Sequence, residues 1–254
     1  MAEKKEPPFF VGYFSTPAPI KAFMALVALF LLGAFSALAL SIATGQDDPG
    51  TGNFQWAWGQ QVVTGRLETL PYPVLHITQG TKHLAAGNSL LLSGVGKKGI
   101  QTRVEELDGK LVQLKGIALQ RGDIRALQVG DGQDAITAVD GTTPGQEIKQ
   151  LGRWRLKGEI CDGKCLAGAM RPGRGMSHRA CANLCLIGGA PPVFVSADPV
   201  DNQDFFLIGD SDGNPLPADY LNYVALLVSL EGTVERRGEL LVFKADWPTL
   251  KVLQ

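Results

Sequence analysis

The chain contains four cysteines, and all of them lie within a window of 25 residues: Cys161, Cys165, Cys181 and Cys185. They form two C-x3-C pairs that are separated by fifteen residues. Thiols four positions apart share one face of a turn, so the two pairs could form disulfides with each other or bind one metal ion. We therefore expect the specialised chemistry of the chain in residues 161–192.

The second cysteine pair is predicted to lie on a short helix. Ser177 is a favourable N-cap, and the glycine and proline residues from Gly188 onward end the helical pattern. Cys181 and Cys185 are then at positions i and i+4, and His178 falls on the same helix face.

Two structural disulfides are the first interpretation of the cluster. An even cysteine count is typical of disulfide frameworks in exported domains, and a bridge within one helical pair has poor geometry, so bonds between the pairs are expected. The twin C-x3-C spacing resembles that of the small translocase chaperones of the mitochondrial intermembrane space, whose bridges are nested. The resemblance covers only this window, because Pro172 prevents one long helix across it. An antiparallel approach of the pairs, with the nested connectivity of that family, gives Cys161–Cys185 and Cys165–Cys181.

A metal site is the second interpretation. Four thiolates, or three thiolates with an imidazole, match a tetrahedral zinc centre, although C-x2-C is the commoner zinc spacing. Soft sulfur ligands also suit Cu(I), and Met170 and Met176 lie in the same segment. No cofactor is expected if the disulfides form, and zinc or copper is expected otherwise. The candidate ligands are Cys161, Cys165, Cys181, Cys185 and His178.

Basic residues around the thiols support two further interpretations. They would lower thiol pKa values and so favour thiol–disulfide exchange, although thioredoxin-like exchange usually uses C-x-x-C. They could also form a loop that binds a partner protein. The candidate interaction residues are Lys164, Arg171, Arg174 and Arg179.

Residues 22–46 contain no charged side chain and are long enough to cross a bilayer, which takes about 20 residues of helix. Lys4, Lys5 and Lys21 precede this run, and the next basic residue is Arg66. The positive-inside rule then places the N-terminus in the cytoplasm and the rest of the chain outside it. In a Gram-negative bacterium this is a single-pass inner-membrane protein with periplasmic domains, where disulfides persist.

A cleaved signal peptide is the alternative, because residues 37–39 offer a small-residue cleavage site. The membrane anchor is favoured, since residues 1–21 make a long cytoplasmic N-terminal segment and the apolar run exceeds the h-region of about 7–15 residues. Both interpretations export the remaining chain.

Beyond a linker at residues 47–53, the composition favours β-structure in two similar halves, residues 54–145 and 146–254. Each half shows the order strand–strand–strand–helix–strand–strand, which is typical of an OB-fold barrel. The predicted fold is therefore mostly β, with an N-terminal transmembrane helix and two tandem OB-like modules. Residues 161–192 would be a cysteine-rich helical insertion in the second module. One larger β-sandwich is the alternative.

An internal duplication is predicted from the two final hairpins, which align at an offset of 116 with five identities. Val112, Leu114, Gly116, Arg121 and Gly122 correspond to Val228, Leu230, Gly232, Arg237 and Gly238.

The net charge of −1 and the apolar strands argue against nucleic-acid binding. Local catalytic motifs are missing from the sequence, which favours a non-enzymatic role, although paired carboxylates would leave no such signature. We therefore expect an accessory or assembly subunit of a membrane complex, held in the bilayer by residues 22–46. A zinc- or copper-binding or electron-transfer protein is the alternative.

Overall fold

The computed structural model of the protein describes residues 18–45 and 50–253. The chain divides into two compact units, with the boundary after Asp48. The predicted cytoplasmic segment lies outside the described residues as far as residue 17, and so do residues 46–49 between the predicted span and the β-structure.

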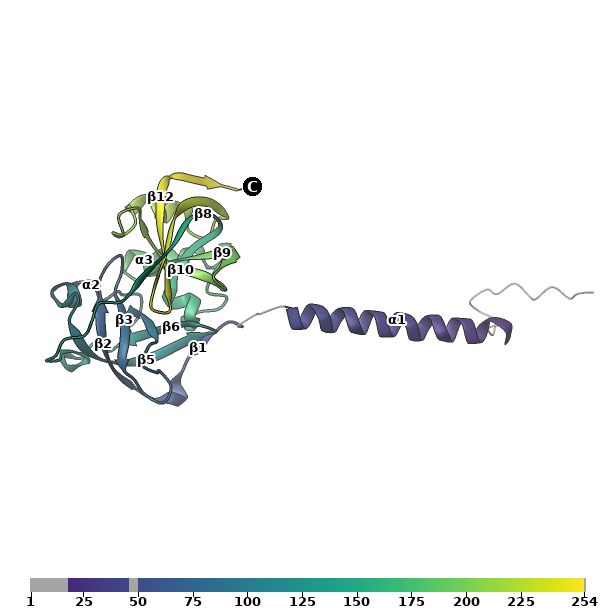
Figure 1. The fold of residues 1–254 in the computed structure, drawn as a ribbon, viewed down its shortest axis with the longest axis horizontal. Coiled ribbons are helices and arrows are strands. Elements are labelled where there is room, and N and C mark those ends of the chain that lie inside the picture. Colours follow the sequence, from purple (N-terminus) through teal and green to yellow (C-terminus); the bar gives the residue numbers. More distant parts are fainter. Residues whose placement is uncertain (1–17, 46–49, 254) are drawn as a thin grey trace, which may run out of the picture. The chain divides into compact units, whose positions relative to one another are not determined.

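The first unit contains helix α1, Ala18–Gly45, drawn in purple in Figure 1. Its stretch Ile20–Ala43 is long and apolar enough to cross a membrane. The large apolar side chains of this helix, such as Phe23 and Phe30, are not packed against other residues of its own unit. The prediction of an N-terminal apolar helix is confirmed, with a start at Ala18 instead of residue 22.

The second unit begins with a sheet of seven strands in the order β1-β5-β2-β3-β4-β6, with β7 beside β5. Strands β5 and β6 also pair with each other, so the path from β5 through β2, β3, β4 and β6 returns to its start. Only β4 and β6 pair in parallel among these described strands. The strands are β1 (Asn53–Phe54), β2 (Gln61–Glu68), β3 (Val74–Gln79), β4 (Ser89–Ser93), β5 (Leu111–Arg121), β6 (Ile124–Val129) and β7 (Ile136–Ala138). The helices are η1 (Trp56–Trp58), α2 (Gln101–Val104), η2 (Glu105–Leu107) and η3 (Gln133–Ala135).

The rest of the second unit forms a closed barrel of five strands in the order β10-β12-β11-β8-β9. This barrel confirms the mostly β class. The strands are β8 (Ile148–Asp162), β9 (Pro192–Val200), β10 (Gln203–Asp210), β11 (Val228–Arg237) and β12 (Leu240–Val252). The helices are η4 (Cys165–Ala169), η5 (Met176–His178), α3 (Arg179–Ile187) and η6 (Ala218–Tyr223).

The same pairing scheme occurs in both strand sets. We count the strands from β2 in the first set and from β8 in the second, which leaves β1 and β7 aside. The first strand then lies between the second and fourth strands, as β2 lies between β3 and β5, and β8 between β9 and β11. The third strand pairs in parallel with the fifth, as β4 with β6 and β10 with β12. The two opening strands lead into connections of different length: β2 reaches β3 through residues 69–73, whereas residues 163–191 separate β8 from β9.

A buried apolar cluster joins the two strand sets, and we call it the interface cluster. Because it removes apolar surface of both sets from water, it holds them in one compact unit. The backbone N–H of Leu216 also donates to the Tyr72 hydroxyl at 3.0 Å, and Arg237 bonds to Glu68 and Glu235. The cluster contains Tyr72, Val74, Leu91, Leu119, Ile124 and Ala126 from the first set, and Cys161, Leu166, Ala167, Val193, Val195, Phe205, Leu207, Leu240 and Val242 from the second.

Replacing Phe243 with alanine is expected to lower the free energy of unfolding by about 3–5 kcal/mol, because a buried aromatic ring is lost and a cavity remains. Phe243 is fully buried in the barrel, where its ring lies 5.5 Å from that of Phe194 and 6.2 Å from that of Phe206. Chemical denaturation of the full chain in detergent, followed by tryptophan fluorescence, measures the change. The exposed Ile148→Ala is the control and should shift the free energy by no more than about 0.5 kcal/mol.

Candidate metal and thiol site

The strand β8 separates the first cysteine from the other three. Successive side chains of a strand point to opposite faces, so Ile160 lies in the barrel core while Cys161 lies in the interface cluster. Beyond the strand end at Asp162, the chain turns into η4, which carries Cys165. Cys161 is thus part of the apolar packing between the two strand sets.

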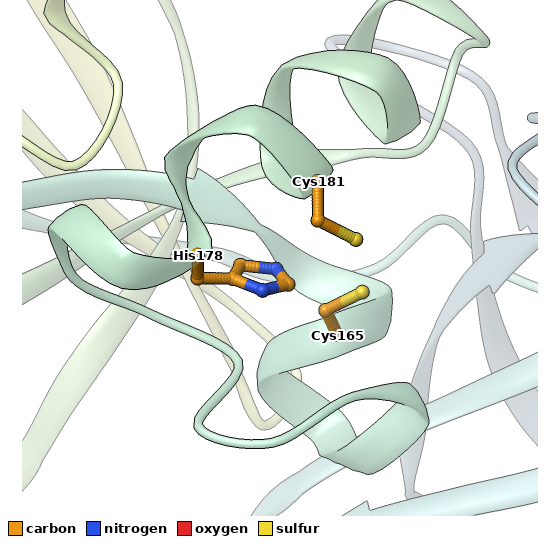
Figure 2. Close-up of side chains that lie close together, drawn as sticks. All are labelled: Cys165, His178 and Cys181. Carbon is orange, nitrogen blue, oxygen red and sulfur yellow. The ribbon is translucent and has the colours of Figure 1, made fainter.

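The remaining three cysteines gather with His178 between η4 and α3. Donor atoms of Cys165, His178 and Cys181 all lie within 4.8 Å of one another, and Figure 2 shows these three side chains pointing toward each other. The Sγ atoms of Cys165 and Cys185 are 3.9 Å apart. Cys165 therefore lies between the two cysteines of α3. Cys181 and Cys185 lie on α3 as predicted, whereas His178 lies in η5 directly before that helix.

Asp162 is a fully buried carboxylate that orients two groups of the site. Its Oδ1 accepts the backbone N–H of Cys165 at 2.7 Å, and its Oδ2 is 3.1 Å from Nε2 of His178. It also forms a second group of donor atoms within 4.8 Å, together with Cys165 and Cys185. A carboxylate on one ring nitrogen of a histidine fixes the ring and leaves the other nitrogen free to act as a ligand.

Lys97 reaches the site from the first strand set. Its Nζ donates to Sγ of Cys181 at 2.7 Å and lies 3.6 Å from Sγ of Cys185. A Cβ on Gly188 would lie 1.7 Å from the Lys97 carbonyl oxygen, so only glycine allows the end of α3 to pack this closely against the Lys97 backbone.

Lys164 is buried and holds the same loop. Its Nζ donates to the carbonyl oxygens of Gly94 at 2.7 Å and Gly96 at 2.6 Å. Burial lowers the pKa of the Lys164 ammonium. The backbone N–H of Gly99 donates to the Gly188 carbonyl at 2.7 Å. These contacts fix residues 94–99 against the cysteine segment.

The four predicted interaction residues have different surroundings. Lys164 is buried, and its role in a partner-binding loop stays a prediction. Arg174 is 3.6 Å from Glu159, and Arg179 donates to the Asn222 carbonyl at 2.7 Å. Arg171 is exposed. The loop itself packs on the site, since a Cβ on Gly173, whose φ is +77°, would lie 2.5 Å from the Cys165 carbonyl oxygen.

The thiol pKa values differ because the environments differ. Burial raises the pKa of Cys161. The hydrogen bond between Cys165 and Cys185 raises the pKa of Cys165 and lowers that of Cys185 to about 7, with the nearby Lys97 also favouring the Cys185 thiolate. The bond to Cys181 in turn raises the pKa of Lys97.

All four cysteines are free, so neither predicted disulfide, Cys161–Cys185 or Cys165–Cys181, is formed. Cys161 and Cys185 lie in different buried clusters, because strand alternation turns Cys161 away from the site. Two site residues were missed in the sequence. Asp162 directly follows Cys161 and could have been weighed as a ligand partner, whereas nothing around Lys97 pointed to the cysteines.

Comparison with protein-family models, with curated proteins and with solved structures gives no match for this chain.

Titration of the metal-free protein should show one thiolate that forms near pH 7 and disappears in Cys185→Ser. Because the pKa is lowered on folding from 9.0, the thiolate adds stability that is complete above pH 9.0 and lost as the pH falls through about 7. Thiolate absorbance in the ultraviolet measures the transition. Lys97→Gln should raise its midpoint, whereas Lys98→Gln, an exposed neighbour, should leave it unchanged. Equal midpoints in the two lysine variants would contradict the role of Lys97.

Proposed function

We propose that this is a membrane-anchored, exported metal-binding protein, in which Cys165, Cys181, Cys185 and His178 hold one zinc ion. The observation that carries the proposal is the central position of Cys165, whose Sγ lies within 4.8 Å of donor atoms of His178 and Cys181 in one group and of Asp162 and Cys185 in another. Three thiolates and one histidine are a complete tetrahedral ligand set for structural zinc.

The charges around the site support a thiolate-bound metal. Three thiolates and a divalent ion leave one negative charge, and the Lys97 ammonium lies 2.7 Å from the sulfur of Cys181. Asp162 supplies the carboxylate that commonly orients a ligating histidine. Cu(I) is the second metal of this proposal, because it also prefers soft sulfur ligands.

We also propose that both strand sets of the second unit are OB-like modules related by duplication. The support is the shared pairing scheme, with the parallel pairs β4–β6 and β10–β12, and the aligned final hairpins. In this interpretation, residues 161–192 are an addition to the second module, and the metal site belongs to that addition.

An accessory role in a membrane complex is the second candidate function. It is favoured by three exposed apolar side chains that lie close to the site in sequence, Met176, Leu184 and Ile187. Exposed apolar side chains mark a protein interface where they form one contiguous patch. The anchor α1 would keep this surface beside other membrane proteins, on the extracytoplasmic side that the positive-inside rule predicts.

Elemental analysis of the full chain, purified anaerobically in mild detergent, tests the metal site. We expect one zinc or copper ion per chain, lost when Cys165, Cys181 or Cys185 is changed to serine. The matched control is Cys161→Ser, which should retain the metal because this thiol lies in the interface cluster. If the reduced wild-type protein binds no stoichiometric zinc or copper when these metals are added, the proposal is wrong.

Asp162→Asn should weaken metal affinity by about 10–100-fold, because the orientation of a ligating histidine depends on its hydrogen-bond partner. The amide keeps the size and the acceptor oxygen of the side chain but loses its charge. Competition with a chromophoric chelator measures the affinity. An unchanged affinity would show that Asp162 does not orient His178 for metal binding.

The topology is tested by fusing a phosphatase that is active only in the periplasm to the C-terminus, in a Gram-negative host. We expect active phosphatase in the membrane fraction, still bound after alkaline extraction, because α1 is long and apolar enough to span the bilayer. Phosphatase activity in the soluble fraction would instead favour a cleaved signal peptide. An inactive fusion would indicate the opposite topology, with the C-terminus in the cytoplasm.

A further inference from the structure

The three gathered sulfurs have different access to solvent. Cys165 and Cys185 are 3 % and 2 % exposed, whereas Cys181 is only half-buried. The buried Sγ atoms of Cys165 and Cys185 are 3.9 Å apart, which is van der Waals contact, while a disulfide bond is about 2.05 Å long. These two sulfurs are therefore direct neighbours, and a bond between them requires a closer approach of the two side chains.

Cys165 can reach both cysteines of α3. Its Sγ belongs to one donor group with Cys181 and to another with Cys185, and within each group the atoms lie no more than 4.8 Å apart. The Lys97 ammonium donates a hydrogen bond to Sγ of Cys181 at 2.7 Å. The segment thus has a central sulfur, Cys165, with the more accessible sulfur of Cys181 and the buried sulfur of Cys185 each close to it.

We propose that these three cysteines carry out thiol–disulfide exchange, in which Cys181 accepts a disulfide from a donor molecule and Cys165 and Cys185 store it. This is an activity beyond metal binding and does not require a metal to bind. The donor is any peptide or protein with an accessible disulfide bond.

The exchange proceeds in three balanced steps. The Cys181 thiolate attacks one sulfur of the donor disulfide, and the other donor sulfur leaves as a thiolate. The Cys165 thiol then attacks Sγ of Cys181 and passes its proton to the second donor sulfur, which leaves as a thiol. Finally the Cys185 thiolate attacks Sγ of Cys165, and Cys181 leaves as a thiolate beside Lys97.

In total, the protein loses two electrons and the one proton of Cys165, and the donor disulfide becomes one thiol and one thiolate. The reverse sequence passes the disulfide from the buried pair to an acceptor dithiol. Oxidation also removes Cys165 and Cys185 as thiolate ligands, so the disulfide form could not hold a metal in the proposed Cys3His site.

The test uses the full chain in detergent, reduced, freed of metal by a chelator, and equilibrated with glutathione and glutathione disulfide. Peptide mapping by mass spectrometry should find Cys165–Cys185 as the final bond in the wild type. Cys185→Ser should stop at Cys165–Cys181, and Cys165→Ser should stop at a glutathione adduct of Cys181. Cys161→Ser is the matched control and should behave as the wild type.

Cys181→Ser should form the same final bond at a rate lower by about tenfold or more, since only thiolates with access to the donor attack quickly. A wild-type protein that forms no internal disulfide, or one that ends with Cys161 or Cys181 in the bond, would overturn the proposal. An unchanged rate in Cys181→Ser would overturn the entry role of this thiol.

Metal content is measured separately on the reduced protein, so the two proposals can fail independently. A Cys165–Cys185 bond in a protein that never binds metal refutes the metal site alone. A stoichiometric metal in a protein whose thiols never pair refutes the exchange alone.

Discussion

The buried ammonium of Lys164 is the contact on which the arrangement of the site depends. An ion of this kind is costly to bury unless hydrogen bonds compensate it, and the carbonyl oxygens of Gly94 and Gly96 provide them. The loop of residues 94–99 is thereby fixed to the cysteine segment, and this brings Lys97 to the sulfurs of α3. A site composed mostly of one segment thus receives its nearest cation from the other strand set.

The hydrogen bond between Cys165 and Cys185 has the largest effect on both thiol pKa values, and opposite charges on the two sides of the site add to it. Asp162 is buried beside Cys165 and His178, and its charge disfavours thiolates near it. Lys97 acts in the opposite direction on the α3 side of the site. The result is an asymmetric set of thiols, in which Cys185 ionises easily and Cys165 does not. This asymmetry suits metal binding, because a metal ion needs thiolate ligands. It also suits thiol–disulfide exchange, because the exchange needs sulfurs with different roles.

Local sequence patterns predicted the apolar helix, the two long hairpins and the helix with Cys181 and Cys185 on one face. These features depend on periodicity and on turn residues that are close in sequence, so local sequence patterns are sufficient to predict them. The exclusion of Cys161 was not predicted, although alternation along the strand could have indicated it, since Ile160 had to face the barrel core. The roles of Lys97 and Lys164 depend on contacts between distant segments, which spacing within one segment cannot reveal.

The site is formed by two segments that are distant in the chain, residues 94–99 and the cysteine segment, and their contact constrains how the sequence can change in evolution. The close backbone approach of Gly188 to Lys97 leaves no space for a side chain at Gly188. Replacing Gly188 therefore requires the backbone of residues 94–99 to move away from the end of α3. Although far apart in the chain, these two stretches constrain each other, whereas Cys161 is constrained by the apolar side chains that surround it.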